Sequence, residues 1–310
     1  MSKKSLYFLG ILLTAILGAY FNWMFCCPPD GKTDTKTPAV APVVKPTTPS
    51  PTSYGLTFND NSGFNYAVND NFNFEKSDFS ILKPISSKVD DGVLKLKDYL
   101  VSNPSKVIDI TGYFKSTEEN TSAYPNLGLA RANAVKNYLI AQGISSKQIN
   151  TFGKLEDSMI PDGNVFKGPV AFGFETMDLS DEGSKKAAEE LEAMHQEIMA
   201  HPLELHFATN SSSIKLTSEQ RQEMADIAKY LDKVDDAKVL VVGHTDNTGN
   251  AEANMELGLN RANTIKQYLV RNQILPSKIE TLSKGQNQPI ASNETPVGRA
   301  KNRRVMVTLK

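Results

Sequence analysis

The amino-acid sequence predicts an α/β protein that contains two tandem copies of one domain. Short apolar runs alternate with helical periodicity over residues 54–178 and again over 202–310, which predicts layered strands and helices. An internal repeat supports two copies: residues 127–142 read LGLARANAVKNYLIAQ and residues 257–272 read LGLNRANTIKQYLVRN, with nine of sixteen positions identical. A charge-free apolar stretch near the N-terminus predicts a membrane segment outside both copies.

The N-terminal stretch is expected to cross the inner membrane once. Residues 5–27 carry no charged side chain and have about the length of a hydrocarbon core, so they predict a transmembrane helix. Two lysines precede the stretch, which places residues 1–4 in the cytoplasm and the C-terminal domains on the other side of the membrane. A cleaved signal peptide and lipidation of Cys26 or Cys27 stay open, although bulky residues before the cysteines do not suit a lipoprotein signal.

Residues 28–53 read as a Pro/Thr-rich linker. They hold seven prolines and show no hydrophobic period. A semi-extended chain of this length reaches up to roughly 80 Å at about 3.1 Å per residue. We therefore expect a tether that holds the globular part away from the membrane.

Composition excludes several classes of function. The net charge of -1 over 310 residues argues against nucleic-acid binding by bulk electrostatics. The four histidines are loosely spaced and the only two cysteines are adjacent, so no metal site and no cofactor are predicted.

The first domain is expected over residues 54–178 and the second over 202–310, joined by a charged, solvated helix within 179–201. In the first domain, the pattern predicts strands at 71–74, 107–110, 149–152 and 170–174, and helices at 89–100 and 127–142. In the second, it predicts strands at 203–207, 239–242, 279–282 and 304–309, and helices at 218–231 and from about 250 to 269.

The stretch with the clearest chemistry is residues 243–269. An apolar strand ends in Gly-His-Thr-Asp-Asn-Thr-Gly, which puts Asp246 at the strand's C-terminal end, and a helix follows at once. The spacing predicts that Asn254, Gly258 and Arg261 share the edge of that helix, with the glycine leaving room for a ligand. A carboxylate and a guanidinium would thus converge at a site for a ligand carrying both charges. The predicted core face of the helix consists of Met255, Leu259, Ala262, Ile265 and Leu269.

Several ordered segments resemble the OmpA C-terminal-like peptidoglycan-binding family over residues 203–310. The resemblance rests on Phe207-Ala208-Thr209-Asn210, Gly243-His244-Thr245-Asp246-Asn247-Thr248-Gly249, Asn254, Leu257, Arg261-Ala262 and Gly298-Arg299-Ala300-Lys301-Asn302-Arg303-Arg304-Val305. It implies an α/β sandwich that holds peptidoglycan non-covalently through the diaminopimelate of its stem peptide. Together with the N-terminal membrane segment, it implies C-terminal domains in the periplasm of a Gram-negative-type bacterium. By position it implies that Asp246 pairs with the ligand's ammonium and Arg261 with its carboxylate. It also implies support from Asn210, Asn254 and Arg303, with Thr245, Thr248 and Arg304 as secondary candidates.

The chemistry of these residue types agrees with that implication. Diaminopimelate is a zwitterion at one end; an arginine grips a carboxylate through two parallel hydrogen bonds, and an aspartate accepts from an ammonium. Plainer readings stay open at this point: Asp246 as a turn former, Arg261 paired with Asp246, and the arginines of 299–304 protecting an edge strand.

The first copy departs from the pattern at specific places. Arg131 remains, but Lys115 or Ser116 falls where Asp246 would be, and Tyr124 stands in for Asn254. Lys76 or Ser77 replaces Asn210, and Gly168-Pro169 replaces the two arginines. A lysine opposite an arginine could not hold a zwitterion. We expect the first domain to keep the fold without the ligand, as a spacer or a surface for other envelope proteins.

Two function classes follow. The first is a membrane-tethered, non-enzymatic anchor that fixes itself or an envelope complex to peptidoglycan. The second is a stator-like energy-transducing membrane subunit with a wall-binding domain, against which the lack of an acidic residue within 5–27 argues. A peptidoglycan-cleaving enzyme is weaker, because Asp246 has no second carboxylate or nucleophile at a supported spacing.

Overall fold

The computed structural model describes residues 16–17, 19–20, 50–207 and 216–310. The chain divides into two compact units, Met1–Thr48 and Pro49–Lys310. Most of the predicted membrane segment and linker, together with Cys26 and Cys27, lies outside the described residues, and so does Asn210. Among the residues that are described, no helix has the length and apolarity to span a membrane.

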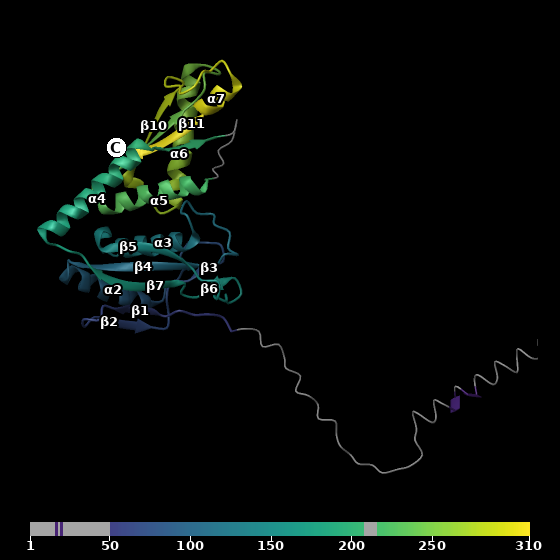
Figure 1. Cartoon of the computed structure of the whole chain (residues 1–310), viewed down its shortest axis with the longest axis vertical. Coiled ribbons are helices and arrows are strands. Elements are labelled where there is room, and N and C mark those ends of the chain that lie inside the picture. Colours follow the sequence, from purple (N-terminus) through teal and green to yellow (C-terminus); the bar gives the residue numbers. More distant parts are fainter. Residues whose placement is uncertain (1–15, 18, 21–49, 208–215) are drawn as a thin grey trace, which may run out of the picture. The chain divides into compact units, whose positions relative to one another are not determined.

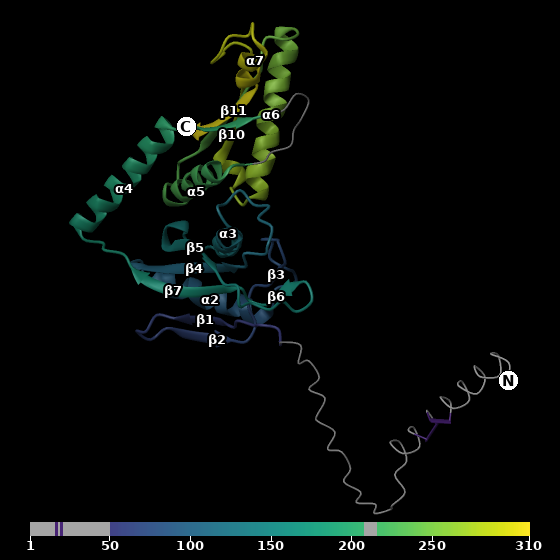
Figure 2. The ribbon, with the colours of Figure 1, turned by 45° about the vertical axis from the view of Figure 1, so that its right-hand side comes forward.

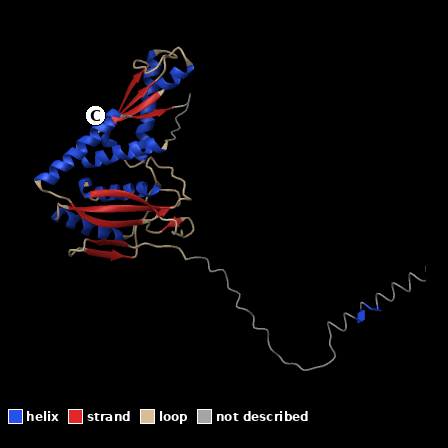
Figure 3. Cartoon of the chain, viewed as in Figure 1, coloured by secondary structure: helices blue, strands red, loops and turns tan. Residues whose placement is uncertain are grey.

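The second copy contains one four-stranded sheet with helices packed against it (Figures 1 and 3). Its strand order is β10-β9-β11-β8; β10 runs parallel to β9, and β11 runs antiparallel to both β9 and β8. The strands are β8 (Leu203–His206), β9 (Val239–His244), β10 (Ile279–Gly285) and β11 (Arg304–Leu309), and the helices are α5 (Ser218–Lys233), α6 (Ala251–Arg271) and α7 (Pro296–Asn302). The single-turn 3-10 helix η2 (Pro276–Lys278) precedes β10.

The first copy repeats three of these strands in the order β5-β4-β7, with β5 parallel and β7 antiparallel to β4. They are β4 (Lys106–Phe114), β5 (Ile149–Leu155) and β7 (Val170–Thr176), accompanied by α2 (Ser87–Ser102), α3 (Leu127–Ala141) and the 3-10 helix η1 (Ser146–Gln148). The predicted α/β class and the tandem repeat of the fold are confirmed.

The first copy differs where the fourth strand is expected. The predicted strand at 71–74 is instead β3 (Phe74–Glu75), which pairs with β6 (Val165–Phe166) outside the main sheet. An unpredicted hairpin, β1 (Leu56–Asn59) and β2 (Asn65–Val68), adds aromatic side chains to this copy's core.

Side-chain caps define where the helices begin. Asn126 accepts from the Leu129 amide at the start of α3, and Asn250 accepts from the Ala253 amide at the start of α6. Thr217 and Gln220 form a reciprocal capping box on α5. The connecting helix α4 (Asp181–Ala200) is mostly exposed as predicted, but Ile198 is buried in the second core.

Each copy has its own hydrophobic core, and the two cores meet. The second core includes three side chains of the first copy, Ala123, Tyr124 and Ala130. Figure 2 shows α3 and α5 facing each other where the copies meet. Residues 50–310 therefore contain a packed contact between repeats.

In each copy one helix crosses a strand at a very short distance: α3 crosses β4 in the first copy, and α6 crosses β9 in the second. A Cβ atom added to Gly243 in β9 would lie 1.9 Å from the Gly258 carbonyl oxygen in α6, and one on Gly112 would lie 2.0 Å from the Gly128 oxygen. Only glycine allows this backbone contact. The room that Gly258 was expected to leave for a ligand is therefore occupied by β9, and this prediction was wrong.

This crossing also changes which side of α6 faces the sheet. Met255 and Leu259 are 40% and 39% exposed, so their assignment to the core face was wrong. Asn254, Gly258 and Arg261 are buried in their place, because the glycine contact turns this row toward the strands. The prediction holds for Ala262, Ile265 and Leu269, which are fully buried.

Candidate ligand site

Asp246 follows β9 directly and is held by two donors. Its Oδ2 accepts from Arg303 Nη1 at 2.9 Å, and its Oδ1 accepts from the Thr248 amide at 2.9 Å. Burial raises the pKa of Asp246, but the hydrogen bonds from Arg303 and Thr248 outweigh burial, and the pKa lies below its ordinary value. The carboxylate is thus charged at neutral pH and nearly buried.

Arg261 is buried in α6 and makes few contacts for a buried guanidinium. Its Nη1 donates to the His244 carbonyl oxygen at 3.2 Å, and its guanidinium lies over the Phe207 ring at 5.9 Å. Within 50–207 and 216–310 it makes no other hydrogen bond and no ion pair. Burial and the nearby positive charge of Arg303 lower the pKa of Arg261. The negative charge of Asp246 acts in the opposite direction and raises the pKa. Such a group favours an incoming anion.

The loop that follows β9 contains or contacts three further candidates, Thr245, Thr248 and Asn254. Asn254 Nδ2 donates to the Thr248 carbonyl oxygen at 3.1 Å and to Gln286 Oε1 at 2.6 Å. The Thr245 amide donates to the Gly285 carbonyl oxygen at 2.9 Å, and the Thr245 hydroxyl donates to the backbone carbonyl oxygen of Asp246. Asn254 and Thr245 therefore hold the Asp246 loop in place, and Gln286 is a participant that sequence reasoning missed.

Arg304 does not join this group. Its guanidinium donates to the Gln288 carbonyl oxygen, and its Nε lies 3.7 Å from Glu204. Arg304 is the first residue of β11, whereas Arg303 precedes the strand as the C-cap of α7. Since β11 lies between β9 and β8, the arginines do not protect an edge strand.

His244 was quoted only as part of a motif, yet it lies within the site. It is buried, and its Nδ1 has no hydrogen-bond partner in the described part of the chain. Burial lowers the pKa of His244 to about 4, assisted by the positive charges of Arg304 and Lys284. The imidazole is therefore neutral at physiological pH.

The equivalent arginine of the first copy is fully satisfied by its own chain. Arg131 is completely buried, and its Nη1 donates to the Tyr113 carbonyl oxygen at 2.9 Å, the counterpart of the bond from Arg261 to His244. Its remaining donors reach the Asp78 and Glu75 carbonyl oxygens and both oxygens of Glu118. All five N–H groups of Arg131 are used.

Glu118 is the residue that sequence reasoning missed in the first copy. Its carboxylate is buried and also accepts from the Ser77 and Lys115 amides at 3.0 and 2.8 Å. The expectation of a lysine opposite Arg131 was wrong: Lys115 Nζ donates instead to the carbonyl oxygens of Asp157 and Met159. A carboxylate of the chain itself thus binds the arginine.

The second-copy site can recognise a small polar group with a negative and a positive end. No group of three or more His, Cys, Asp or Glu side chains that could hold a metal ion occurs within the described ranges. The arrangement offers ion pairing and hydrogen bonding through Asp246, Arg303 and Arg261.

Known proteins with similar sequences match about a third of the chain. Outer membrane protein Omp38 of Acinetobacter baumannii is 41% identical over 108 residues, covering 34% of this chain and 30% of that protein. Peptidoglycan-binding protein ArfA of Mycobacterium tuberculosis is 43% identical over 83 residues, covering 27% of this chain and 26% of that protein. The solved peptidoglycan-associated lipoprotein from Burkholderia pseudomallei is 26% identical over 34% of this chain and 89% of that one, with a TM-score of 0.30.

The chain thus spans less than a third of the length of these two curated relatives. The OmpA family matches both repeats, at residues 72–163 and 206–303, which together make up more than half of the sequence. The chain belongs to the OmpA family.

Proposed function

We propose that this chain is a membrane-tethered cell-wall anchor whose second copy binds peptidoglycan non-covalently. Membership of the OmpA family and similarity to a protein named for peptidoglycan binding support the ligand class. The observation that carries the proposal is the contrast between two equivalent arginines. Arg131 holds the chain's own Glu118, whereas Arg261 offers its donors beside the charged Asp246.

The zwitterionic end of diaminopimelate suits this arrangement. Its carboxylate takes the place beside Arg261 that Glu118 has beside Arg131, and its ammonium approaches Asp246. Each charge-assisted contact contributes about 1.5–3 kcal/mol net. A single site therefore binds modestly, and the tether supplies the rest by raising the effective concentration of the wall at the site.

The N-terminal part completes the anchor. Residues 5–27 hold the chain in the inner membrane as a single-pass helix, residues 28–53 extend into the periplasm, and the first copy acts as a spacer or a surface for other envelope proteins. The anchor performs no chemistry on the wall.

Co-sedimentation of the full chain, kept in mild detergent, with purified sacculi tests the site. Asp246→Ala and Arg261→Ala are each expected to weaken retention about tenfold or more, since each removes one charged partner of the ligand. Arg261→Lys keeps the charge but loses the paired hydrogen bonds, so it should bind almost as poorly.

The matched control is Lys301→Ala, which removes an exposed positive charge from the same copy. It should bind like the wild type. Unchanged retention of both Asp246→Ala and Arg261→Ala would refute the site. Sugar or peptide release from the sacculi would refute the anchor in favour of an enzyme.

A further inference from the structure

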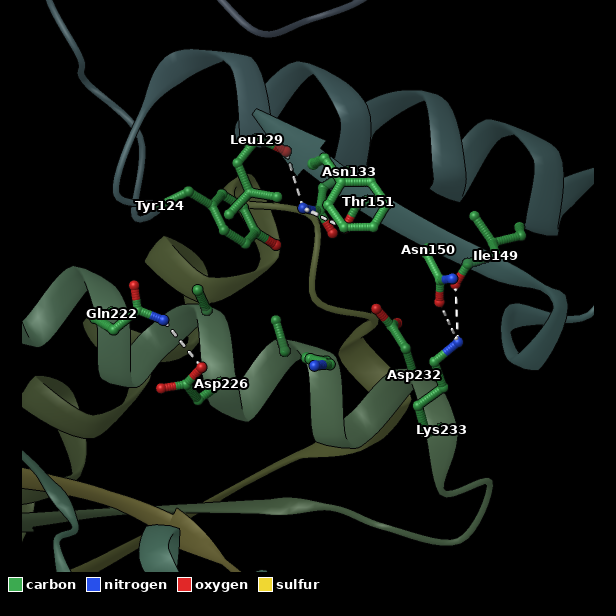
Figure 4. A pocket seen from close by; sticks show the side chains of 14 residues that line it. Tyr124, Leu129, Asn133, Ile149, Asn150, Thr151, Gln222, Asp226, Asp232 and Lys233 are labelled. Atoms are coloured by element: carbon green, nitrogen blue, oxygen red, sulfur yellow. Dashed lines mark hydrogen bonds between the residues drawn. The ribbon is translucent and has the colours of Figure 1, made fainter. Parts of the chain in front are cut away.

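The contact between the two repeats has a defined geometry. The α3/β5 face of the first copy receives α5 of the second: Lys136 Nζ forms an ion pair with Asp232, and Lys233 Nζ donates to Ile149 O and Asn150 Oδ1 at 3.0 Å each. Leu129 packs against the second core. Figure 4 shows α3 and β5 on one side and α5 on the other of a groove of about 360 Å³.

The second copy presents the same face without a partner among the described residues. At an offset of 130 residues, Leu259 corresponds to Leu129 and Leu282 to Phe152, and Lys266 corresponds to Lys136. Leu259 and Leu282 are 39% and 40% exposed. A shallow hollow continues along α6, lined by Asn263, Lys266, Gln267, Val270 and Arg271. We call this the α6/β10 face.

The helix equivalent to α5 is α2, and its outward side is unusually apolar. Both helices have 16 residues, and the buried Val93, Leu96 and Leu100 of α2 align with Met224, Ile227 and Leu231 of α5. On the outward side, Leu94 of α2 corresponds to Ala225 of α5, and Val101 corresponds to Asp232. Ala225 and Asp232 line the groove between the repeats.

Leu94 and Val101 are 49% and 69% exposed, and they lie two turns apart on one side of α2. Charges flank these apolar residues on the exposed side of α2: Lys95 follows Leu94, and Asp98 lies one turn before Val101. Apolar side chains thus occur on α2 at the positions that α5 uses for docking, opposite the exposed Leu259 and Leu282 of the α6/β10 face.

We propose that the outward side of α2 in one chain docks onto the α6/β10 face of a second copy of this chain. The contact has the arrangement that the first and second copies form within one molecule, with an apolar Val101 in the place of the ion-paired Asp232. It is heterologous, because each chain contributes a different face, and it leaves one unused face at each end of a pair. Association therefore continues into larger assemblies, which would array wall-binding sites along one line.

Two double variants separate the faces. Leu94→Asp/Val101→Asp removes the docking helix surface, and Leu259→Asp/Leu282→Asp removes the receiving face. Sedimentation velocity of the full chain in detergent, over a range of concentrations, should show mass increasing with concentration for the wild type. Each double variant alone should associate at least roughly tenfold more weakly.

Mixing supplies the decisive result. A one-to-one mixture of the two double variants retains one intact face of each kind, so it should form pairs and nothing larger. Leu179→Asp, which changes an exposed apolar residue outside both faces, should behave like the wild type. All variants share residues 1–48, so differences report on the two faces alone. Thermal unfolding followed by circular dichroism checks that each variant folds.

The proposal is wrong if the wild type stays at one mass, if either double variant associates like the wild type, or if the mixture stays monomeric. Association of the mixture beyond pairs would also overturn it, because that would require a third contact.

Discussion

The two repeats place the same arginine at the same point of the fold and satisfy it differently. Arg131 and Arg261 each donate through Nη1 to the carbonyl oxygen at the end of the preceding strand. In the first copy a loop residue, Glu118, supplies the carboxylate; in the second no described residue does. A buried guanidinium needs an anion. The first repeat carries that anion in its own chain, and in the proposed function the second repeat leaves the position to a ligand.

What the repeats share explains the fold, and where they differ explains the proposed function. The glycine crossing recurs at Gly112 with Gly128 and at Gly243 with Gly258, and an asparagine caps the helix in both copies. Asp246 and its donor Arg303 occur in the second copy alone. The first copy therefore serves as an internal reference for the second.

The largest expected effect separates the two arginines. Arg131→Ala leaves the buried Glu118 unpaired, which should lower the free energy of unfolding by about 3–5 kcal/mol and leave retention on sacculi unchanged. Arg261→Ala should cost only about 1 kcal/mol in stability and weaken retention about tenfold or more. Urea unfolding and co-sedimentation measure both effects. Equal stability losses, or equal retention losses, would show that the arginines have the same role.

The sequence predicted the shared features well, because the repeat and the alternating apolar runs are local signals. It placed Asp246 after a strand and Arg261 on the helix that follows, which is where they lie. It misassigned Met255 and Leu259, since periodicity places the largest apolar residues inward and does not report that two backbones touch at Gly243 and Gly258.

Glu118 could not be found from the repeat for a different reason. It lies in the loop of residues 115–126, whose length has no counterpart after β9, so an alignment places no partner opposite it. Its role depends on the loop folding back over Arg131, a long-range contact that sequence spacing does not encode. The presence of a conserved fold with an altered loop was predictable, but the identity of the pairing residue was not.

The next expected effect concerns acid stability. His244 has a pKa of about 4 in the folded chain against an ordinary value of 6.5, so the unfolded chain takes up the proton first. Stability from this residue is therefore complete above about pH 6.5 and is lost as the pH falls toward 4, by up to about 3 kcal/mol. In the first copy, Tyr113 holds this position.

His244→Gln isolates that contribution. Carboxylates with lowered pKa, such as Asp246, also lose stabilisation in acid, but they are the same in both proteins. The difference in unfolding free energy between wild type and His244→Gln should therefore change between pH 6.5 and pH 4, with the wild type losing more. A constant difference across that range would contradict the buried neutral imidazole.

The smallest effect tests most directly whether Glu118 takes the place of a ligand carboxylate. Glu118→Ala leaves Arg131 with a vacated anion position, and added acetate should bind there because it replaces the lost carboxylate and its acceptors for the Ser77 and Lys115 amides. At an acetate concentration several times its dissociation constant, the variant should gain about 1 kcal/mol of stability. Glu118→Gln fills the same volume without a charge, so acetate has no room and should not stabilise it. Thermal unfolding in acetate and in chloride at equal ionic strength measures the gain. If acetate stabilises the wild type and both variants equally, the salt acts on the whole protein and the Arg131 site is not a carboxylate site. If acetate stabilises Glu118→Ala alone, the first repeat retains the carboxylate-recognition chemistry that we propose for the second.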